Sequence, residues 1–252
     1  MTASTAIPQE IEAKLLVPRA ATLRAVARLK ELGPYRLRAR QTVRLHTIYL
    51  DTAEFTLARR GVALRLRRER ARWETTVKWS GREDGMVHTR PELTVRLSSP
   101  PSFPFSLPPG PLTAYLAELI AGRSLAPILL SEVRRQRFAV RVGEQLKAPA
   151  FAELALDHVR LSAPSQRRAP AATYCEVEIE LEVQGMEPQM LDFARLLSER
   201  FALAPAEGSK FSRGLALLYG PGLLGSGRTG RWAVPRQRPA ARKKANPPTS
   251  QQ

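Results

Sequence analysis

Cysteine is nearly absent from this chain of 252 residues, which contains a single one, so no intramolecular disulfide can form. No apolar run approaches the roughly 18 residues of a membrane-spanning helix. The N-terminal stretch carries Glu10 and Glu12 where a secretory signal peptide would need an apolar segment. These absences predict a protein of the reducing cytoplasm with no membrane attachment.

Acidic residues are few relative to basic ones. The chain has 40 Lys and Arg residues against 23 Asp and Glu residues, which gives a formal net charge of +17. A protein this basic is expected to meet phosphate-rich partners, although charge alone does not choose between nucleic acid, anionic lipid and a small polyphosphate. With 43% hydrophobic and 25% charged residues, the composition suits a soluble globular protein and excludes disordered and collagen-like chains.

Residues 221–252 lack acidic side chains altogether. The segment has five prolines, four glycines and seven basic residues, which are Arg228, Arg231, Arg236, Arg238, Arg242, Lys243 and Lys244. So little apolar matter predicts a disordered tail behind a folded domain of residues 1–220. Subtracting these seven charges from +17 leaves +10 on the domain. We expect the tail to bind anions nonspecifically or to aid solubility, since it has few aromatic residues for nucleic-acid recognition.

Apolar and polar residues alternate along much of the domain, which is typical of β-strands. Eight segments show or allow this pattern: 9–17, 43–51, 62–70, 73–79, 88–98, 133–142, 150–161 and 173–184. Helical spacing predicts three helices, over residues 18–32, 112–120 and 190–201. Mostly antiparallel strands with a few helices indicate an α+β protein or a barrel.

The polar faces of the expected strands separate by charge. Arg65 and Arg67 share one face, whereas glutamates occupy every second position from Glu176 to Glu182. One interpretation is that each face is the wet side of a half-buried sheet. The other is that the strands close into a barrel with an acidic and a basic inner wall. Carboxylates without His or Cys suit Mg²⁺ or Mn²⁺, and Arg and Lys suit phosphate, so a closed barrel predicts a metal and polyphosphate site.

Several of these segments carry a resemblance. Glu10-x-Glu12-x-Lys14 resembles the ExExK strand of the CYTH domain, also called the triphosphate tunnel metalloenzyme superfamily. Other segments resemble the family's successive motifs in order over about residues 8–219: Tyr49 to Thr52, Gly61 to Arg67, Thr76 to Lys78, Arg90 to Glu92, Leu156-Asp157, Cys175 to Glu178 and Ser209-Lys210. Through Lys78 to Arg82 and His88 to Glu92 the chain is similar to bacterial inorganic triphosphatases with an N-terminal CYTH domain.

The resemblance implies an eight-stranded antiparallel β-barrel, a tunnel with a charged lumen and a few flanking helices. It implies hydrolysis of inorganic triphosphate to pyrophosphate and phosphate with Mg²⁺ or Mn²⁺. The implied catalytic residues are Glu10, Glu12, Lys14 and Glu178, and the implied metal ligands are Glu10, Glu12, Asp157, Glu176 and Glu178. The implied phosphate-binding residues are Lys14, Arg65, Arg67, Lys78, Arg90, Arg135, Arg137 and Lys210, with Glu180 next on the acidic face and Glu92 orienting the basic groups. The run Arg134 to Arg137 also allows a shift of one residue, which would exchange its two faces.

Two further functional classes remain open from the sequence. The same tunnel could act on thiamine triphosphate or a nucleoside triphosphate, or cyclise ATP, and a pocket for a nucleobase or thiazolium would favour that class. Alternatively, the tail could bind polyphosphate or RNA beside an inert tunnel, with strongly salt-dependent affinity. The sequence does not predict the metal preference, the physiological substrate or the oligomeric state.

Overall fold

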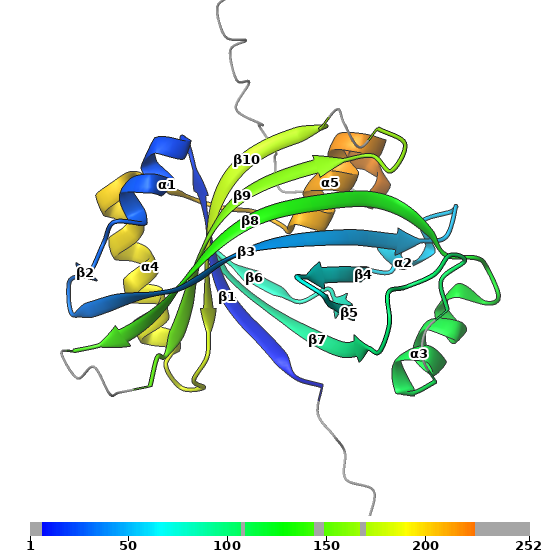
Figure 1. Ribbon diagram of the computed structural model, residues 1–252, viewed down its shortest axis with the longest axis horizontal. Helices are drawn as coiled ribbons and strands as arrows, with labels where there is room; N and C mark the ends of the chain where they lie inside the picture. Colours follow the sequence, from blue (N-terminus) through cyan, green and yellow to red (C-terminus); the bar gives the residue numbers. More distant parts are fainter. Residues whose placement is uncertain (1–6, 107–108, 144–148, 167–169, 225–252) are drawn as a thin grey trace, which may run out of the picture.

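Eight long antiparallel strands form a closed ring in the computed structural model, which describes residues 7–106, 109–143, 149–166 and 170–224 (Figure 1). They are β1 (Gln9–Val17), β3 (Tyr35–Asp51), β4 (Val62–Glu69), β5 (Arg72–Trp79), β7 (Val87–Leu97), β8 (Ala126–Val142), β9 (Ala152–Ser162) and β10 (Ala172–Leu181). The strand order is β1-β10-β9-β8-β3-β4-β5-β7, and pairing of β7 with β1 closes the ring. The predicted α+β tunnel is therefore confirmed, with β3 and β8 longer than the alternating segments indicated.

Five helices and three short strands complete the described chain. The helices are α1 (Ala20–Val26), α2 (Thr56–Arg59), α3 (Pro111–Ile120), α4 (Glu187–Phe201) and α5 (Lys210–Tyr219). The short strands are β2 (Glu31–Leu32), β6 (Arg82–Asp84) and β11 (Ala204–Pro205), and a 3₁₀ turn, η1 (Pro221–Leu224), follows α5. None of the described helices is long and apolar enough to cross a membrane. The predicted tail lies outside the described residues from residue 225 onward.

The first helix differs from its prediction. Spacing over residues 18–32 predicts one helix, but α1 ends at Val26, and β2 pairs Glu31 with Arg36 and Leu32 with Tyr35. The reason is the turn between β2 and β3, where Gly33 adopts a φ of 55°, a conformation that suits glycine and allows a tight hairpin. The predicted helices over 112–120 and 190–201 are confirmed by α3 and α4.

Two of the three hydrophobic core clusters lie on the outer face of the ring. Helices α1 and α4 lie together at one end of the molecule, at the left in Figure 1, where Phe193 and Leu197 pack with Leu154 and Val177 of the sheet. Helix α3 packs through Leu112 and Leu116 on β4 and β5. Because alternate residues of a strand face opposite sides, covering the outer apolar face leaves the charged face directed inward.

Helix α5 packs on the inner face of the ring. Its residues Phe211 and Leu215 cluster with Tyr49, Val133 and Val159 of β3, β8 and β9. It begins with a capping box, in which the Ser209 hydroxyl accepts from the Ser212 amide and the Ser212 hydroxyl accepts from the Ser209 amide. This close packing brings Lys210, the first residue of α5, to the inner wall.

Candidate functional site

A cavity of about 230 Å³ lies inside the ring. All eight basic residues predicted to bind phosphate line it: Lys14, Arg65, Arg67, Lys78, Arg90, Arg135, Arg137 and Lys210. Of the predicted metal ligands, Glu10, Glu12 and Glu178 line it too, together with Glu180. The structure thus brings together side chains from six strands and one helix.

Strand register explains why these charges meet. Across β1 and β10, Glu12 is paired with Glu180 and Lys14 with Glu178, and across β1 and β7, Glu10 is paired with Arg90. Facing residues on neighbouring antiparallel strands have side chains on the same side of the sheet. The alternating pattern of each strand therefore extends across the sheet as rows of charge.

The register also shows which residues of the run Arg134 to Arg137 face the cavity. Arg135 and Arg137 line the cavity, whereas Arg134 is exposed on the outer face. Arg137 lies 3.0 Å from Glu69 and 3.2 Å from Glu153. The expected shared face of Arg135 and Arg137 is therefore confirmed.

Strand β1 contributes two carboxylates that already have basic neighbours. Both oxygens of Glu10 accept from Lys78 Nζ at 2.6 Å. Glu12 lies 2.8 Å from Lys14 Nζ and 2.5 Å from Arg90 Nη2. Although burial would raise the pKa of Glu12, Lys14 and Arg90 lower it well below its usual value, so Glu12 is ionised.

Glu180 is the carboxylate with the least compensation. No basic side chain of the described residues forms an ion pair with it, and Glu10 and Glu12 lie nearby. Desolvation, followed by repulsion from these two glutamates, raises the pKa of Glu180 to about 7. The acidic side of the cavity therefore has an unmet demand for positive charge.

Arg67 is a positive charge that lacks a negative partner among the residues that the structure describes. Its Nε donates to Thr47 Oγ1 at 3.3 Å, but no carboxylate within the described ranges forms an ion pair with it. Burial, followed by repulsion from Arg65 and Arg135, lowers the pKa of Arg67 to about 10. Burial and the charge of Arg65 also lower the pKa of Lys78. This side of the cavity has an unmet demand for negative charge.

Glu92 compensates part of the basic side. Its carboxylate lies 2.6 Å from Lys78 Nζ and 3.6 Å from Arg65 Nη2. Burial would raise the pKa of Glu92, but Lys78 and Arg65 lower it to about 2. Glu92 thus contacts two of the basic groups that it is predicted to orient.

The two other predicted metal ligands, Asp157 and Glu176, do not line the cavity. They are almost fully buried, with 0% and 1% of their surfaces exposed, beneath Lys210. Lys210 Nζ lies 3.0 Å from Asp157 Oδ2 and 2.7 Å from Glu178 Oε1, and it also pairs with Glu176. Despite burial, the three carboxylates raise the pKa of Lys210 well above its usual value. An ammonium group therefore occupies the center of this acidic cluster.

Two arginines complete the ion pairs of the cluster. Arg135 donates to both oxygens of Asp157, at 2.8 and 2.7 Å, and also pairs with Glu178. Arg213 donates to Glu176 at 2.8 Å and lies over the ring of Tyr174, with the guanidinium carbon 4.3 Å from the ring center. Sequence reasoning missed Arg213, since it missed α5. The amphipathic spacing of Phe211, Leu215 and Leu218 after Ser209 was the signal that could have revealed the helix.

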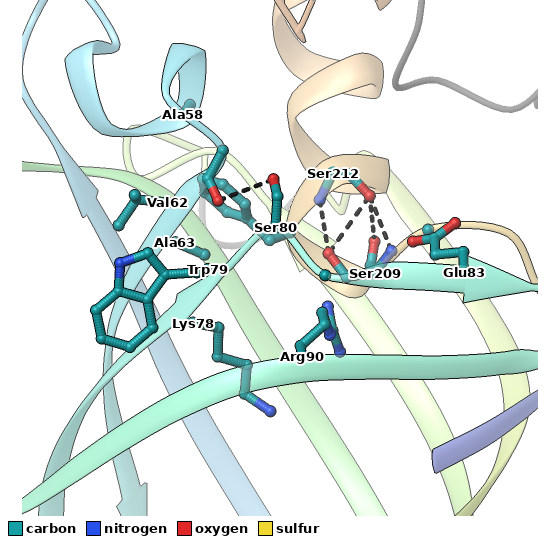
Figure 2. A pocket seen from close by; sticks show the side chains of 14 residues that line it. Ala58, Val62, Ala63, Lys78, Trp79, Ser80, Glu83, Arg90, Ser209 and Ser212 are labelled. Carbon is teal, nitrogen blue, oxygen red and sulfur yellow. Dashed lines mark hydrogen bonds between the residues drawn. The ribbon is translucent and has the colours of Figure 1, made fainter. Parts of the chain in front are cut away.

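A second cavity, of about 370 Å³, adjoins the first (Figure 2). Five residues line both cavities: Ala63, Lys78, Arg90, Ser209 and Phe211. Figure 2 shows Ser209 and Ser212, joined by dashed lines, where α5 begins at the edge of this cavity. Apart from Lys78, Arg90 and Glu83, its lining is uncharged and mostly small, with Trp79 and Phe211 as the aromatic members.

The donor set of the main cavity suits a hard divalent cation. Glu10, Glu12, Glu178 and Glu180 offer only carboxylate oxygens, the ligands that Mg²⁺ and Mn²⁺ take. The raised pKa of Glu180 is the electrostatic sign that a cation would be favoured among them. Asp157, Glu176 and Glu178 also have oxygens within 4.8 Å of one another, but Lys210, Arg135 and Arg213 already pair with that group.

Comparison with known proteins agrees with this architecture. The model of the CYTH domain family matches residues 8–215. A candidate adenylyl cyclase from Hippeastrum, described as having a dominant triphosphatase activity, superposes with a TM-score of 0.51 at 16% identity, covering 82% of this chain and 95% of its own. A candidate adenylate cyclase from Bacillus halodurans gives a TM-score of 0.51 at 20% identity, covering 81% and 96%. At these identities the two structures support the fold alone.

Proposed function

Because the chain belongs to the CYTH domain family, we propose that its tunnel binds inorganic triphosphate and hydrolyses it to pyrophosphate and phosphate. The observation that supports this proposal most is the pair of opposed, uncompensated charges in one cavity. Glu180 has a raised pKa on one side, and Arg67 has a lowered pKa on the other. A bound metal ion would compensate the charge at Glu180, and a bound polyanion would compensate the charge at Arg67. Either ligand alone would leave one of these two charges uncompensated.

In this proposal, the metal is Mg²⁺ or Mn²⁺, and Glu10, Glu12 and Glu178 hold it with Glu180. Such a metal supplies Lewis acidity and lowers the pKa of a bound water molecule. Asp157 and Glu176 contribute through Lys210 and Arg135, whose ammonium and guanidinium groups they hold in place. We therefore assign these two carboxylates a positioning role rather than the ligand role that the resemblance implies.

The basic residues would bind the phosphate oxygens. Arg65 and Arg67 project from one strand, β4, and can each offer paired N–H groups to phosphate, while Lys78 acts as a point charge. Arg135 and Lys210 are oriented by buried carboxylates, so little reorganisation is needed when the substrate binds. No side-chain nucleophile is needed, because phosphoryl transfer to water depends mainly on positioning and charge stabilisation.

A direct test is phosphate release from tripolyphosphate, pyrophosphate, ATP and thiamine triphosphate, compared side by side with Mg²⁺, Mn²⁺ or EDTA. The proposal expects tripolyphosphate to have the highest kcat/KM and EDTA to abolish turnover. Turnover that persists in EDTA would contradict the proposal, and so would a failure to hydrolyse tripolyphosphate. The matched control is Arg195→Gln, an exposed arginine on α4 far from the cavity, which should leave the rates unchanged.

The second cavity supports one alternative, an organic triphosphate. It is larger than the tunnel cavity, it is lined mostly by uncharged residues, and it meets the tunnel at Lys78 and Arg90. An uncharged group attached to a terminal phosphate would fit such a lining better than further phosphates would. Ser80→Trp, which fills this cavity, would then lower kcat/KM for the organic substrate and leave that for tripolyphosphate unchanged.

A further inference from the structure

The net charge of the protein is not located in the tunnel. The residues that line the main cavity include eight basic groups and seven carboxylates. Adding the ion-paired Asp157, Glu176 and Arg213 beneath them makes nine of each. The tunnel region is therefore neutral, and the +17 of the chain must be carried elsewhere.

Part of this charge lies on the outer face of the ring. Asp157, Arg135 and Arg67 face inward, so their neighbours along β9, β8 and β4 face outward. Strand register then aligns Arg44, Arg134 and His158 in one row across β3, β8 and β9. The next row contains Arg68, His46, Glu132 and Arg160. We call these two rows the outer arginine face.

The outer arginine face is open to solvent and poorly neutralised. Arg44, Arg68 and Arg134 are exposed, and none of them forms an ion pair within the described part of the chain. Glu132 is the one carboxylate in the two rows, and it lies 4.0 Å from both Arg160 and His46. In Figure 1 the middle parts of β3, β8 and β9 lie between the α1 and α4 pair on the left and α3 on the right.

The chemistry of this face favours nucleic acid over a membrane. Its cations are arginines, which bind phosphate through paired N–H groups, and it includes no lysine. Arg68 lies over the half-buried ring of Trp73, 5.9 Å from its center, so a cation and an aromatic ring lie together at the edge of the face. Arginine and aromatic surfaces on which bases stack are typical of single-stranded nucleic-acid sites. No exposed large apolar side chain lies in these rows to insert among lipid chains.

We propose that the outer arginine face binds the phosphate backbone of single-stranded RNA, independently of the tunnel. The face would hold the strand by electrostatic contacts without reading its sequence. The tunnel would remain free while RNA is bound, since the two rows point away from it. This function is separate from triphosphate hydrolysis and does not require it.

The test measures fluorescence anisotropy of a labelled 5′-hydroxyl single-stranded RNA with the full chain. This RNA has no triphosphate, so its binding does not depend on the proposed hydrolysis. The double variant Arg44→Ser/Arg134→Ser removes two contacts from the face. Its matched control, Arg59→Ser/Arg200→Ser, removes the same charge from exposed positions on α2 and α4. The tail is present in every protein, so its contribution is constant.

The double variant is expected to bind RNA about tenfold more weakly at 100 mM salt, with a salt slope smaller by roughly 1.4, whereas the control changes little. Equal losses in the two variants would overturn the proposal, because binding would then follow net charge or the tail. The same measurement with vesicles containing phosphatidylserine tests the membrane. Binding to vesicles that depends on Arg44 and Arg134, without binding to RNA, would also overturn it.

Discussion

The side-chain nitrogen of Lys210 lies 3.0 Å from a carboxylate oxygen of Asp157, at a place where the sequence predicts a metal ion. The ammonium group, on α5, thus pairs with carboxylates of β9 and β10 from the inner face of the ring. The contact between Lys210 and Asp157 therefore links α5 to the buried acidic cluster at the wall of the cavity. The predicted acidic residues therefore form two groups. Glu10, Glu12 and Glu178 line the cavity, whereas Asp157 and Glu176 are buried beneath Lys210.

Replacing Lys210 tests the first consequence. Lys210→Met would leave Asp157, Glu176 and Glu178 without their shared cation, and removing one partner of a buried ion pair costs about 3–5 kcal/mol. We expect the free energy of unfolding in urea to fall by that order, and Mg²⁺ to raise the stability of this variant more than that of the unchanged protein. The exposed Lys30→Met serves as control. Unchanged stability would mean that the cluster does not depend on Lys210.

The two groups of carboxylates can be distinguished by paired variants. Glu10→Gln removes a proposed metal ligand that is partly accessible from the cavity, so turnover should be abolished while the melting temperature changes little. Asp157→Asn removes a fully buried partner of Arg135 and Lys210, so it should lower the melting temperature and raise KM. The Mg²⁺ concentration for half-maximal activity should remain near normal in Asp157→Asn. A large rise in that Mg²⁺ concentration would indicate that Asp157 is a metal ligand after all.

Acid sensitivity follows from Glu92. Its pKa is lowered from 4.5 to about 2, so the charged form stabilises the fold above pH 4.5, and this contribution is lost as the pH falls toward 2. Glu92→Gln should therefore cost on the order of 3 kcal/mol at pH 7, and the difference from the unchanged protein should shrink between pH 5 and pH 3. Urea unfolding at each pH measures it. Glu31→Gln, which breaks an exposed pair with Arg36, should cost less than about 1 kcal/mol at any pH. A Glu92 effect that is constant with pH would exclude this ionic origin.

Local alternation predicted most of the strands and their charged faces, whereas the closure of the strands into a ring was implied by the family resemblance. In β10, for example, three glutamates alternate with Cys175, Val177, Ile179 and Leu181, and the structure places the apolar set against α1 and α4. The separation of Asp157 and Glu176 from the cavity could not be predicted in this way. Both residues lie on the inward face of their strands, as Glu178 does, and only the packing of α5 over them covers them. Contacts between residues far apart in sequence, such as Arg213 with Glu176, leave no periodic signal.

The last prediction concerns Arg67, whose charge has no ion-pair partner among the described residues. Replacing it should affect stability and activity in opposite ways. Burial and the neighbouring Arg65 and Arg135 lower the pKa of Arg67, so its charged form is disfavoured in the metal-free and substrate-free protein. Arg67→Gln should therefore leave the free energy of unfolding unchanged or raise it. The same variant should lower kcat/KM for tripolyphosphate by roughly tenfold to a hundredfold, because a charged hydrogen bond to phosphate is lost. Steady-state kinetics and urea unfolding on one preparation measure both effects. If Arg67→Gln destabilised the protein as much as Lys210→Met, the guanidinium would be a structural partner, and the phosphate site would have to be sought at other residues of the tunnel.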